Sequence, residues 1–333
     1  LVNQWIERIE EFLPNARIGK IQGQIIDIED KDIVIGMLQS LSMKEYPDEM
    51  YNSFGLTIVD ECHHISSEVF SRCLKKIVTK NMLGLSATMQ RKDGLTKVFK
   101  MYLGEIVYKA KRDTHDKVLV KAINYTTSDE NFNKVILDFR GNTAQSKMIS
   151  KLCEYNQRSD FIIKVLKKEL EEKNDQQIMV LGQNKNLLIY IHNAVKEQDI
   201  ASVGFYIGGM KDADLKVSET KKIIVATYAM ASEGLDIKTL STLFLVSPRT
   251  DVVQAVGRIL RVKHERPLVI DLIDPHQNFI NQWNKRRAFY KKNKYKIIMT
   301  DNKEYFNNCW NINNDSDTKV INEKKIKKCL ITI

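Results

Sequence analysis

The stretch GLTIVDECHH, residues 55–64, places two adjacent carboxylates directly after a short apolar run. The run is rich in β-branched residues, which is typical of a strand that is covered on both faces of a parallel sheet. In α/β folds the loops at the carboxyl ends of such strands carry the ligand-binding groups. The stretch therefore predicts a strand that ends at a chemical site containing Asp60 and Glu61.

Similar apolar runs recur along the chain, separated by longer helical stretches. They are residues 82–88, 178–182, 223–227, 242–246 and 268–272. Strands that alternate with helices indicate parallel sheets with helical crossovers. We therefore predict an α/β fold whose parallel sheets are covered by helices.

The length of 333 residues suits two domains, each with its own core. We expect the first domain over residues 1–112, a polar connecting segment over 113–160, and the second domain over 161–296. The Asn- and Lys-rich residues 297–333 predict a basic tail that is partly ordered at best.

The amino-acid composition limits the functions that this chain can have. Lys and Arg outnumber Asp and Glu by 52 to 42, and the net charge of +10 favours a polyanionic partner such as nucleic acid. The chain has no apolar run long enough to span a membrane, no secretory leader pattern and no C-x-x-C pair among its five cysteines. We expect a soluble intracellular protein with reduced thiols and no membrane partner, in the cytoplasm, the nucleus or a virion. The abundance of Asn, Lys and Ile hints at an AT-rich viral or microbial genome.

Neighbouring carboxylates repel each other unless a cation or different surroundings separate their roles. We expect Asp60 to bind Mg²⁺ and Glu61 to take a proton from water. Two alternatives stay open. The pair could cap the first turn of a helix, or Cys62, His63 and His64 could bind zinc, although three consecutive residues cannot easily chelate one tetrahedral ion.

The next apolar run ends in Ser86-Ala87-Thr88. An Asp-Glu-x-His string followed by Ser-Ala-Thr resembles superfamily 2 helicases, and within them the branch of XPB-type and phage UvsW-type enzymes; the resemblance covers residues 1 to about 297. It implies two RecA-like domains and assigns Mg²⁺ binding to Asp60 and the general base to Glu61. It also implies that His63 links the nucleotide site to the opposite domain, and that Ser86 and Thr88 couple hydrolysis to strand movement.

Residues 223–236 read as a strand, a helical turn and a Gly-Leu-Asp loop, which is the form of the family's fifth motif. We expect Thr227 to donate a hydrogen bond to a nucleic-acid phosphate. Gly234 would permit close approach of the backbone to a ligand. Asp236 would accept a hydrogen bond from the nucleotide ribose or from a catalytic partner.

The string DVVQAVGRILR, residues 251–261, predicts a helix with Gln254, Arg258 and Arg261 on one face. A guanidinium is always charged and can follow charge that builds on a transferred γ-phosphoryl group. The resemblance assigns this finger role to Arg258 and Arg261, while a solvated basic helix is the alternative. Because the carboxylates and arginines fall in different domains, we expect ATP to close the cleft between them.

Candidate nucleic-acid contacts follow two of the apolar runs. Gln39 and Ser40 end one run, and Asn184 and Lys185 follow another; all four could equally be ordinary loop residues. Residues 281–300 carry seven Lys or Arg and no acid, interleaved with aromatic residues. These aromatic residues could stack on bases, but their helical spacing favours packing for Trp283.

ATP hydrolysis in this family needs a Gly-rich loop with Gly-Lys-Thr or Gly-Lys-Ser, and the 333 residues contain no such string. Residues 1–5 match the motif that normally follows this loop, so we expect the loop to lie upstream of Leu1. We predict that this chain alone binds ATP poorly and does not hydrolyse it. Phosphate release from a pure sample measures this, and sustained turnover would contradict the expectation.

The sequence thus favours an ATP- and Mg²⁺-dependent helicase or translocase that acts on nucleic acid, DNA more than RNA. One alternative is a non-catalytic nucleic-acid-binding module, which would bind in a salt-sensitive way without any nucleotide effect. Another is the motor part of a restriction or remodelling enzyme that moves on duplex without separating its strands.

Overall fold

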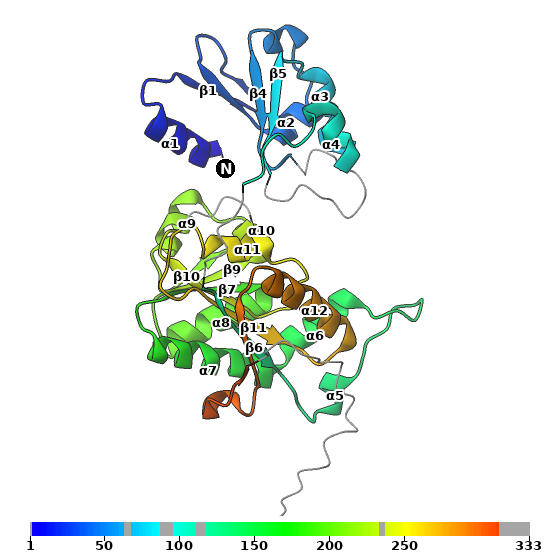
Figure 1. Ribbon diagram of the computed structural model, residues 1–333, viewed down its shortest axis with the longest axis vertical. Helices are drawn as coiled ribbons and strands as arrows, with labels where there is room; N and C mark the ends of the chain where they lie inside the picture. Colours follow the sequence, from blue (N-terminus) through cyan, green and yellow to red (C-terminus); the bar gives the residue numbers. More distant parts are fainter. Residues whose placement is uncertain (1, 63–67, 87–95, 111–116, 233–236, 313–333) are drawn as a thin grey trace, which may run out of the picture. The chain divides into compact units, whose positions relative to one another are not determined.

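The chain divides into two compact units, Leu1–Arg112 and Asp113–Ile333. The computed structural model describes residues 2–62, 68–86, 96–110, 117–232 and 237–312. Both units combine helices with parallel strands (Figure 1).

The first unit contains two small sheets. β1 pairs with β2 antiparallel and with β3 parallel, and β4 pairs with β5 parallel. The elements of this unit are α1 (Val2–Phe12), β1 (Ile18–Gln22), β2 (Ile25–Ile26), β3 (Ile33–Gly36), α2 (Leu38–Met43), η1 (Asp48–Tyr51), β4 (Leu56–Val59), α3 (Glu68–Lys76), β5 (Asn81–Gly84) and α4 (Thr96–Leu103).

One face of the β4–β5 sheet is exposed, although both strands were expected to be covered on both faces. Leu56, Ile58 and Leu83 are 52%, 50% and 37% exposed. The alternate residues Val59 and Met82 pack against the core of the unit. The sequence-based expectation is therefore wrong for these two strands, because the described residues cover one face only.

The second unit is built on an eight-stranded sheet in the order β13-β12-β6-β11-β10-β7-β9-β8. Seven neighbouring strands run parallel, and β13 joins the edge antiparallel to β12. The strands are β6 (Leu119–Asn124), β7 (Gln177–Gly182), β8 (Val203–Tyr206), β9 (Ile223–Thr227), β10 (Leu240–Leu245), β11 (Leu268–Ile273), β12 (Lys296–Asp301) and β13 (Asn311–Ile312).

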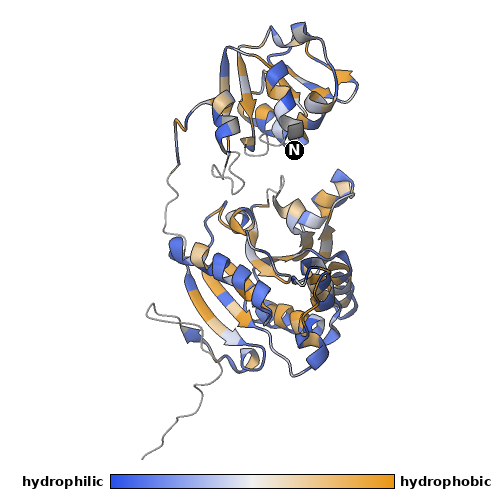
Figure 2. Ribbon diagram, turned by 90° about the vertical axis from the view of Figure 1, so that its right-hand side faces the viewer, coloured by the Kyte–Doolittle hydropathy of each residue, from blue (hydrophilic) through white to orange (hydrophobic). Residues whose placement is uncertain are grey.

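Helices cover both faces of this sheet. They are α5 (Glu130–Asn133), α6 (Gln145–Glu154), α7 (Asn156–Glu172), α8 (Lys185–Glu197), α9 (Asp212–Glu219), α10 (Tyr228–Ser232), α11 (Val253–Arg258) and α12 (Gln277–Lys292), with the 3₁₀ turn η3 (Tyr305–Asn307). In Figure 2 the strands are largely apolar, while the helices also carry polar residues. None of the helices in the described ranges is long and apolar enough to cross a membrane.

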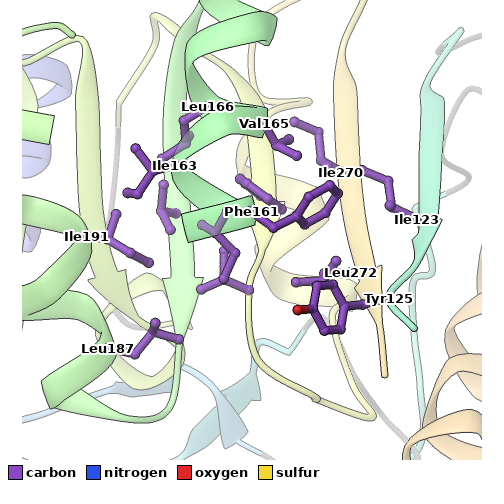
Figure 3. Packing of buried hydrophobic residues seen from close by; sticks show 14 of the residues in the cluster. Ile123, Tyr125, Phe161, Ile163, Val165, Leu166, Leu187, Ile191, Ile270 and Leu272 are labelled. Carbon is purple, nitrogen blue, oxygen red and sulfur yellow. The ribbon is translucent and has the colours of Figure 1, made fainter. Parts of the chain in front are cut away.

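Alternate residues of the central strands pack into two separate cores. Ile178 of β7 belongs to the core formed with α6, α7 and α8, while Met179 belongs to the core on the other face. Figure 3 shows the first core, in which Phe161 of α7 lies near Ile270 of β11 and Ile191 projects from α8. Every residue of β7, β10 and β11 is buried. The prediction of strands covered on both faces is confirmed in this unit.

The predicted connecting segment and tail need correction, because two strands within them, each carrying charged or polar residues, belong to the second sheet. β6 pairs with β11 and β12, so residues 117–160 are part of the second unit. β12 likewise makes residues 296–301 a strand. A charged strand is tolerated because Lys121 Nζ lies 2.7 Å from the buried carboxylate of Glu169, and Tyr305 donates to the same carboxylate at 2.6 Å. Residues 313–333 of the predicted tail lie outside the described residues.

Candidate nucleotide and nucleic-acid sites

Asp60 and Glu61 lie in the turn that follows β4, as the sequence predicts. Asp60 Oδ1 accepts a hydrogen bond from the Glu61 amide at 2.9 Å, and Oδ2 accepts one from the Trp5 indole at 3.3 Å. Glu61 has a φ of 46°, a left-handed conformation that is uncommon in non-glycine residues and gathers at functional sites. Asp60 is exposed, whereas Glu61 is half-buried with its Oε2 atom inaccessible to solvent. The turn thus gives the two carboxyl groups different surroundings, which separate chemical roles require.

The end of β5 lies beside this turn. The Leu85 amide donates to Val59 at 2.9 Å, and the Cys62 amide donates to Leu85 at 2.9 Å, so the pairing continues beyond both strands. A side chain at Gly84 would come within 3.0 Å of the Cys62 sulfur, so this close approach depends on glycine. Ser86 follows directly. The structure thus brings Ser86 to the same sheet end as Asp60, whereas His63 and Thr88 lie outside the described residues.

The donor groups of this turn suit Mg²⁺ better than zinc. Mg²⁺ is commonly held by one or two carboxylates, with water and phosphate oxygens completing its shell, and Asp60 could supply such a ligand. Zinc needs several protein ligands, and of the zinc candidates only Cys62 belongs to the described residues, since His63 and His64 lie outside them. Burial, together with the charge of Glu61, also raises the pKa of the Cys62 thiol, which disfavours the thiolate that zinc requires.

Gln39 and Ser40 both lie on α2 in the first unit. The Ser40 hydroxyl accepts a hydrogen bond from the Gly23 amide at 2.9 Å, so it fixes the turn after β1. Gln39 is exposed and remains available to a ligand.

In the second unit, Asn184, Lys185 and Thr227 lie at the carboxyl ends of the neighbouring strands β7 and β9, where Gly182 pairs with Thr227. Asn184 caps α8 by accepting from the Leu187 amide at 3.0 Å. Thr227 accepts from the amide of the third residue of α10 at 3.4 Å. Two of these candidates therefore have structural roles as helix caps, while the Lys185 side chain is exposed.

Gln254 and Arg258 lie on α11, but the helix ends at Arg258. Arg261 follows in a turn whose amide donates to the Arg258 carbonyl at 3.5 Å, a pattern that tightens and ends helices. The prediction that all three side chains share one helical face is therefore wrong for Arg261, which is exposed. Arg258 Nε donates to the Ala231 carbonyl of α10 at 3.0 Å. Gly234 and Asp236 lie outside the described residues.

The loop 246–249 that connects β10 to α11 is held by four side chains from four different segments. Arg158 donates to the first carbonyl of the loop and Tyr228 to the second, both at 2.9 Å. Gln183 donates to the third and Arg286 to the fourth. Four consecutive carbonyls thus have side-chain donors, and we call this arrangement the carbonyl clamp. It fixes the first part of the loop that leads to α11, the helix that carries Gln254 and Arg258.

Two buried ion pairs support the carbonyl clamp. Arg158 lies 2.6 Å from Asp274, and both side chains are fully buried. Arg286 lies 2.7 Å from Asp271, which also accepts from Tyr290 at 2.9 Å. Burial alone would lower the pKa of each arginine, but the neighbouring aspartate more than offsets it and raises the pKa. Both arginines therefore stay charged and keep their orientation.

The sequence did not point to the donors of the carbonyl clamp. Arg286 falls within the basic stretch 281–300, and nothing in the sequence of this stretch indicates that the Arg286 side chain is buried. The same helix buries Trp283 and Tyr290, so the expectation that Trp283 packs is confirmed. Stacking of these two rings on bases is excluded by their burial. One donor could have been suspected from the sequence. Gln183 follows the end of β7 and directly precedes Asn184, a predicted nucleic-acid contact.

A parallel sheet covered on both faces, with polar groups at the carboxyl ends of its strands, is a doubly wound α/β architecture, and solved helicase structures share its fold. S. cerevisiae Dbp5 bound to RNA and ADP BeF3 superposes with a TM-score of 0.59 over 92% of this chain and 76% of that chain, at 12% identity. Mycobacterium smegmatis helicase Lhr bound to ssDNA and AMP-PNP gives a TM-score of 0.57 over 88% of this chain and 39% of that chain, at 14% identity. At such identities the likeness concerns the fold.

Sequence comparison also finds helicases among the proteins similar to this chain. Residues 1–91 match the family described as Type III restriction enzyme, res subunit. Over 304 residues the chain is 37% identical to "Putative ATP-dependent RNA helicase L396" of Acanthamoeba polyphaga mimivirus, covering 89% of this chain and 58% of that protein. The chain thus spans about three-fifths of this viral relative. The family match and this relative together support a superfamily 2 helicase.

Proposed function

We propose that this chain forms the body of an ATP-dependent nucleic-acid motor. The observation that carries the proposal is the turn after β4, which sets Asp60 and Glu61 in different surroundings beside the end of β5. The likeness to superfamily 2 helicases supplies the reaction class. Residues 1–333 contain no Gly-Lys-Thr or Gly-Lys-Ser string. The proposal therefore concerns what we call the working protein, which is this chain together with the polypeptide that supplies such a string.

In this proposal Asp60 holds Mg²⁺ and Glu61 accepts the proton of the attacking water. Arg258 and Arg261 neutralise charge on the transferred phosphoryl group. Gln254 shares the short helix α11 with Arg258, so the carbonyl clamp positions both. His63, Ser86 and Thr88 would couple hydrolysis to strand movement, and Gly234 and Asp236 would contact the nucleotide.

The polynucleotide would contact both units through the exposed Gln39 and Lys185, with Ser40, Asn184 and Thr227 shaping the adjoining backbone. We propose DNA as the preferred substrate, because the motif pattern resembles the XPB-type and UvsW-type branch. The mimiviral relative is named for RNA. Competition between DNA and RNA oligonucleotides of one sequence decides the choice.

Salt-dependent binding tests the nucleic-acid part of the proposal with the chain as it is. Each neutralised phosphate releases counterions, so affinity for a single strand should fall about tenfold or more between 50 and 200 mM salt if about three phosphates are contacted. Fluorescence anisotropy with a labelled 20-nucleotide strand measures this. An affinity that salt does not change, or no binding at low salt, would argue against a polynucleotide partner.

A second candidate is a motor that moves on duplex without separating its strands. The match of residues 1–91 to a restriction-enzyme subunit family favours this reading. The two activities are distinguished by running strand displacement and triplex displacement on the working protein. Triplex displacement alone would identify a duplex translocase, and displacement of both would identify a helicase.

A further inference from the structure

Residues 135–143, between α5 and α6, form a hairpin that runs out from the second unit and back (Figure 1). Leu137 and Thr143 form an antiparallel bridge across it. Its stem is anchored, because Ile136 packs against the core and its amide lies 3.2 Å from the sulfur of the buried Met148. We call residues 137–143 the hairpin tip. The tip projects while its stem is held on α6.

The hairpin tip has a defined conformation despite its exposure. Asp138 Oδ1 accepts from the amides of Arg140 and Asn142 at 2.8 and 2.9 Å. The Asp138 amide donates back to the Asn142 carbonyl at 2.7 Å. Gly141 has a φ of 78°, which glycine adopts without strain. Such side-chain to backbone bonds are typical of tight Asx turns, so the tip loses little conformational freedom when it binds a partner.

The hairpin tip presents an aromatic ring to solvent. Phe139 is 90% exposed, the largest fraction among the large hydrophobic side chains of the described residues. The Arg140 guanidinium lies 5.0 Å from the ring centroid. Leu137, two positions before it, is 56% exposed. Because Phe139 contributes almost nothing to the folded core, its ring is available to a ligand.

The charges around the hairpin tip favour an anionic ligand. Residues 134–151 contain four cations, Lys134, Arg140, Lys147 and Lys151, and one acid, Asp138. The carboxylate of Asp138 already accepts two backbone amides. An exposed ring beside a cation, here Phe139 with Arg140, is a combination with which proteins bind single strands, because rings stack on bases and cations contact phosphates.

We propose that the hairpin tip is a binding site for single-stranded nucleic acid, in which Phe139 stacks on an unpaired base and Arg140 contacts an adjacent phosphate. The proposal rests on the proposed function, since it needs a polynucleotide partner. It adds a contact outside all the motifs that link the chain to its family. A protein that docks on the same apolar tip would be a different occupant, and the test separates the two.

The test measures the affinity of the chain for a fluorescein-labelled 20-nucleotide strand, and the emission of 2-aminopurine placed within it. Phe139→Ala should weaken binding about tenfold, in line with the loss of one stacked base, and should reduce the change in 2-aminopurine emission on binding. Phe139→Trp should preserve both. Phe139→Leu keeps an apolar side chain without a ring, so it should behave like Phe139→Ala. Arg140→Ala should lower the salt slope by about one unit.

Lys164→Ala, which removes an exposed cation from α7, is the matched control for Arg140 and should show a smaller loss. Thermal unfolding of the Phe139 variants should match wild type, because the ring is exposed. If wild type binds and Phe139→Ala binds equally well, or if Phe139→Leu equals wild type, the stacking site is refuted while the proposed function stands. If wild type itself fails to bind, the proposed nucleic-acid function and this site both fail.

Discussion

Replacing Arg158 by methionine is expected to lower the free energy of unfolding of the second unit by about 3–5 kcal/mol, because it leaves the carboxylate of Asp274 buried without its ion pair. Both side chains are fully buried, and Arg158 Nε lies 2.6 Å from Asp274 Oδ1. The substitution also removes the donor to the Val246 carbonyl, so the first contact of the carbonyl clamp is lost. A loss of this size is large against the stability of a typical domain.

Urea denaturation measures this effect. Trp283 and Trp310 lie in the second unit, so their fluorescence in a Trp5→Phe background reports on that unit alone. Lys173→Met is the matched control, since its pair with Asp175 is 3.9 Å long and the Asp175 side chain is 81% exposed; we expect a loss below about 1 kcal/mol.

The double variant Arg158→Met with Asp274→Leu separates two contributions to the loss of stability, that of the unpaired buried charge and that of the altered packing. Replacement of both partners by apolar side chains should recover much of the stability, because no unpaired charge remains. If the single variant were as stable as wild type, the ion pair would not support the carbonyl clamp. If the double variant were no more stable than the single one, the lost stability would come from packing rather than from the unpaired carboxylate.

Arg258→Ala is expected to reduce nucleic-acid-stimulated ATP hydrolysis by the working protein about 10³-fold or more, the effect that an arginine finger has in other NTPases. The reason is the loss of positive charge beside the transferred phosphoryl group. The loss should fall on kcat more than on KM, because this charge acts mainly in the transition state. Steady-state kinetics over a range of ATP concentrations measure both constants.

Two variants serve as controls for Arg258→Ala. Lys263→Ala removes an exposed cation just beyond α11 and should leave kcat within about twofold of wild type. Arg258→Lys keeps the charge but not the planar fork, and should restore only part of the rate. If kcat of Arg258→Ala stayed close to wild type, the finger role would belong to another residue, and Arg258 would have a structural role that includes the bond to the Ala231 carbonyl.

The central strands of the second unit could be predicted from the sequence because burial on both faces leaves a continuous apolar run. β7, β10 and β11 are of this kind. β6 was not recognised, since Lys121 interrupts its apolar run and only the structure shows that Glu169 pairs with this lysine. The apolar run of β4 has the same form, yet half of its residues are exposed. A run of apolar residues therefore indicates a strand, but not what covers it.

The candidate site, too, could be predicted only in part from the sequence. Asp60, Glu61 and Ser86 could be placed together because parallel strands end at one edge of a sheet. The arginines of the carbonyl clamp could not, because the sequence does not distinguish a buried, paired arginine from a solvated one. Arg261 was misplaced because the helix ends three residues earlier through local hydrogen bonds that no residue type announces.

The most direct test of the central claim is ATP hydrolysis by the working protein with and without a polynucleotide, for wild type and for Glu61→Gln. Glutamine keeps the shape of the side chain and removes the base. We predict that a saturating oligonucleotide raises the wild-type rate severalfold and that Glu61→Gln loses at least about 100-fold in kcat while it still binds the strand. A wild-type rate that ignores the polynucleotide, or an unimpaired Glu61→Gln variant, would contradict the account.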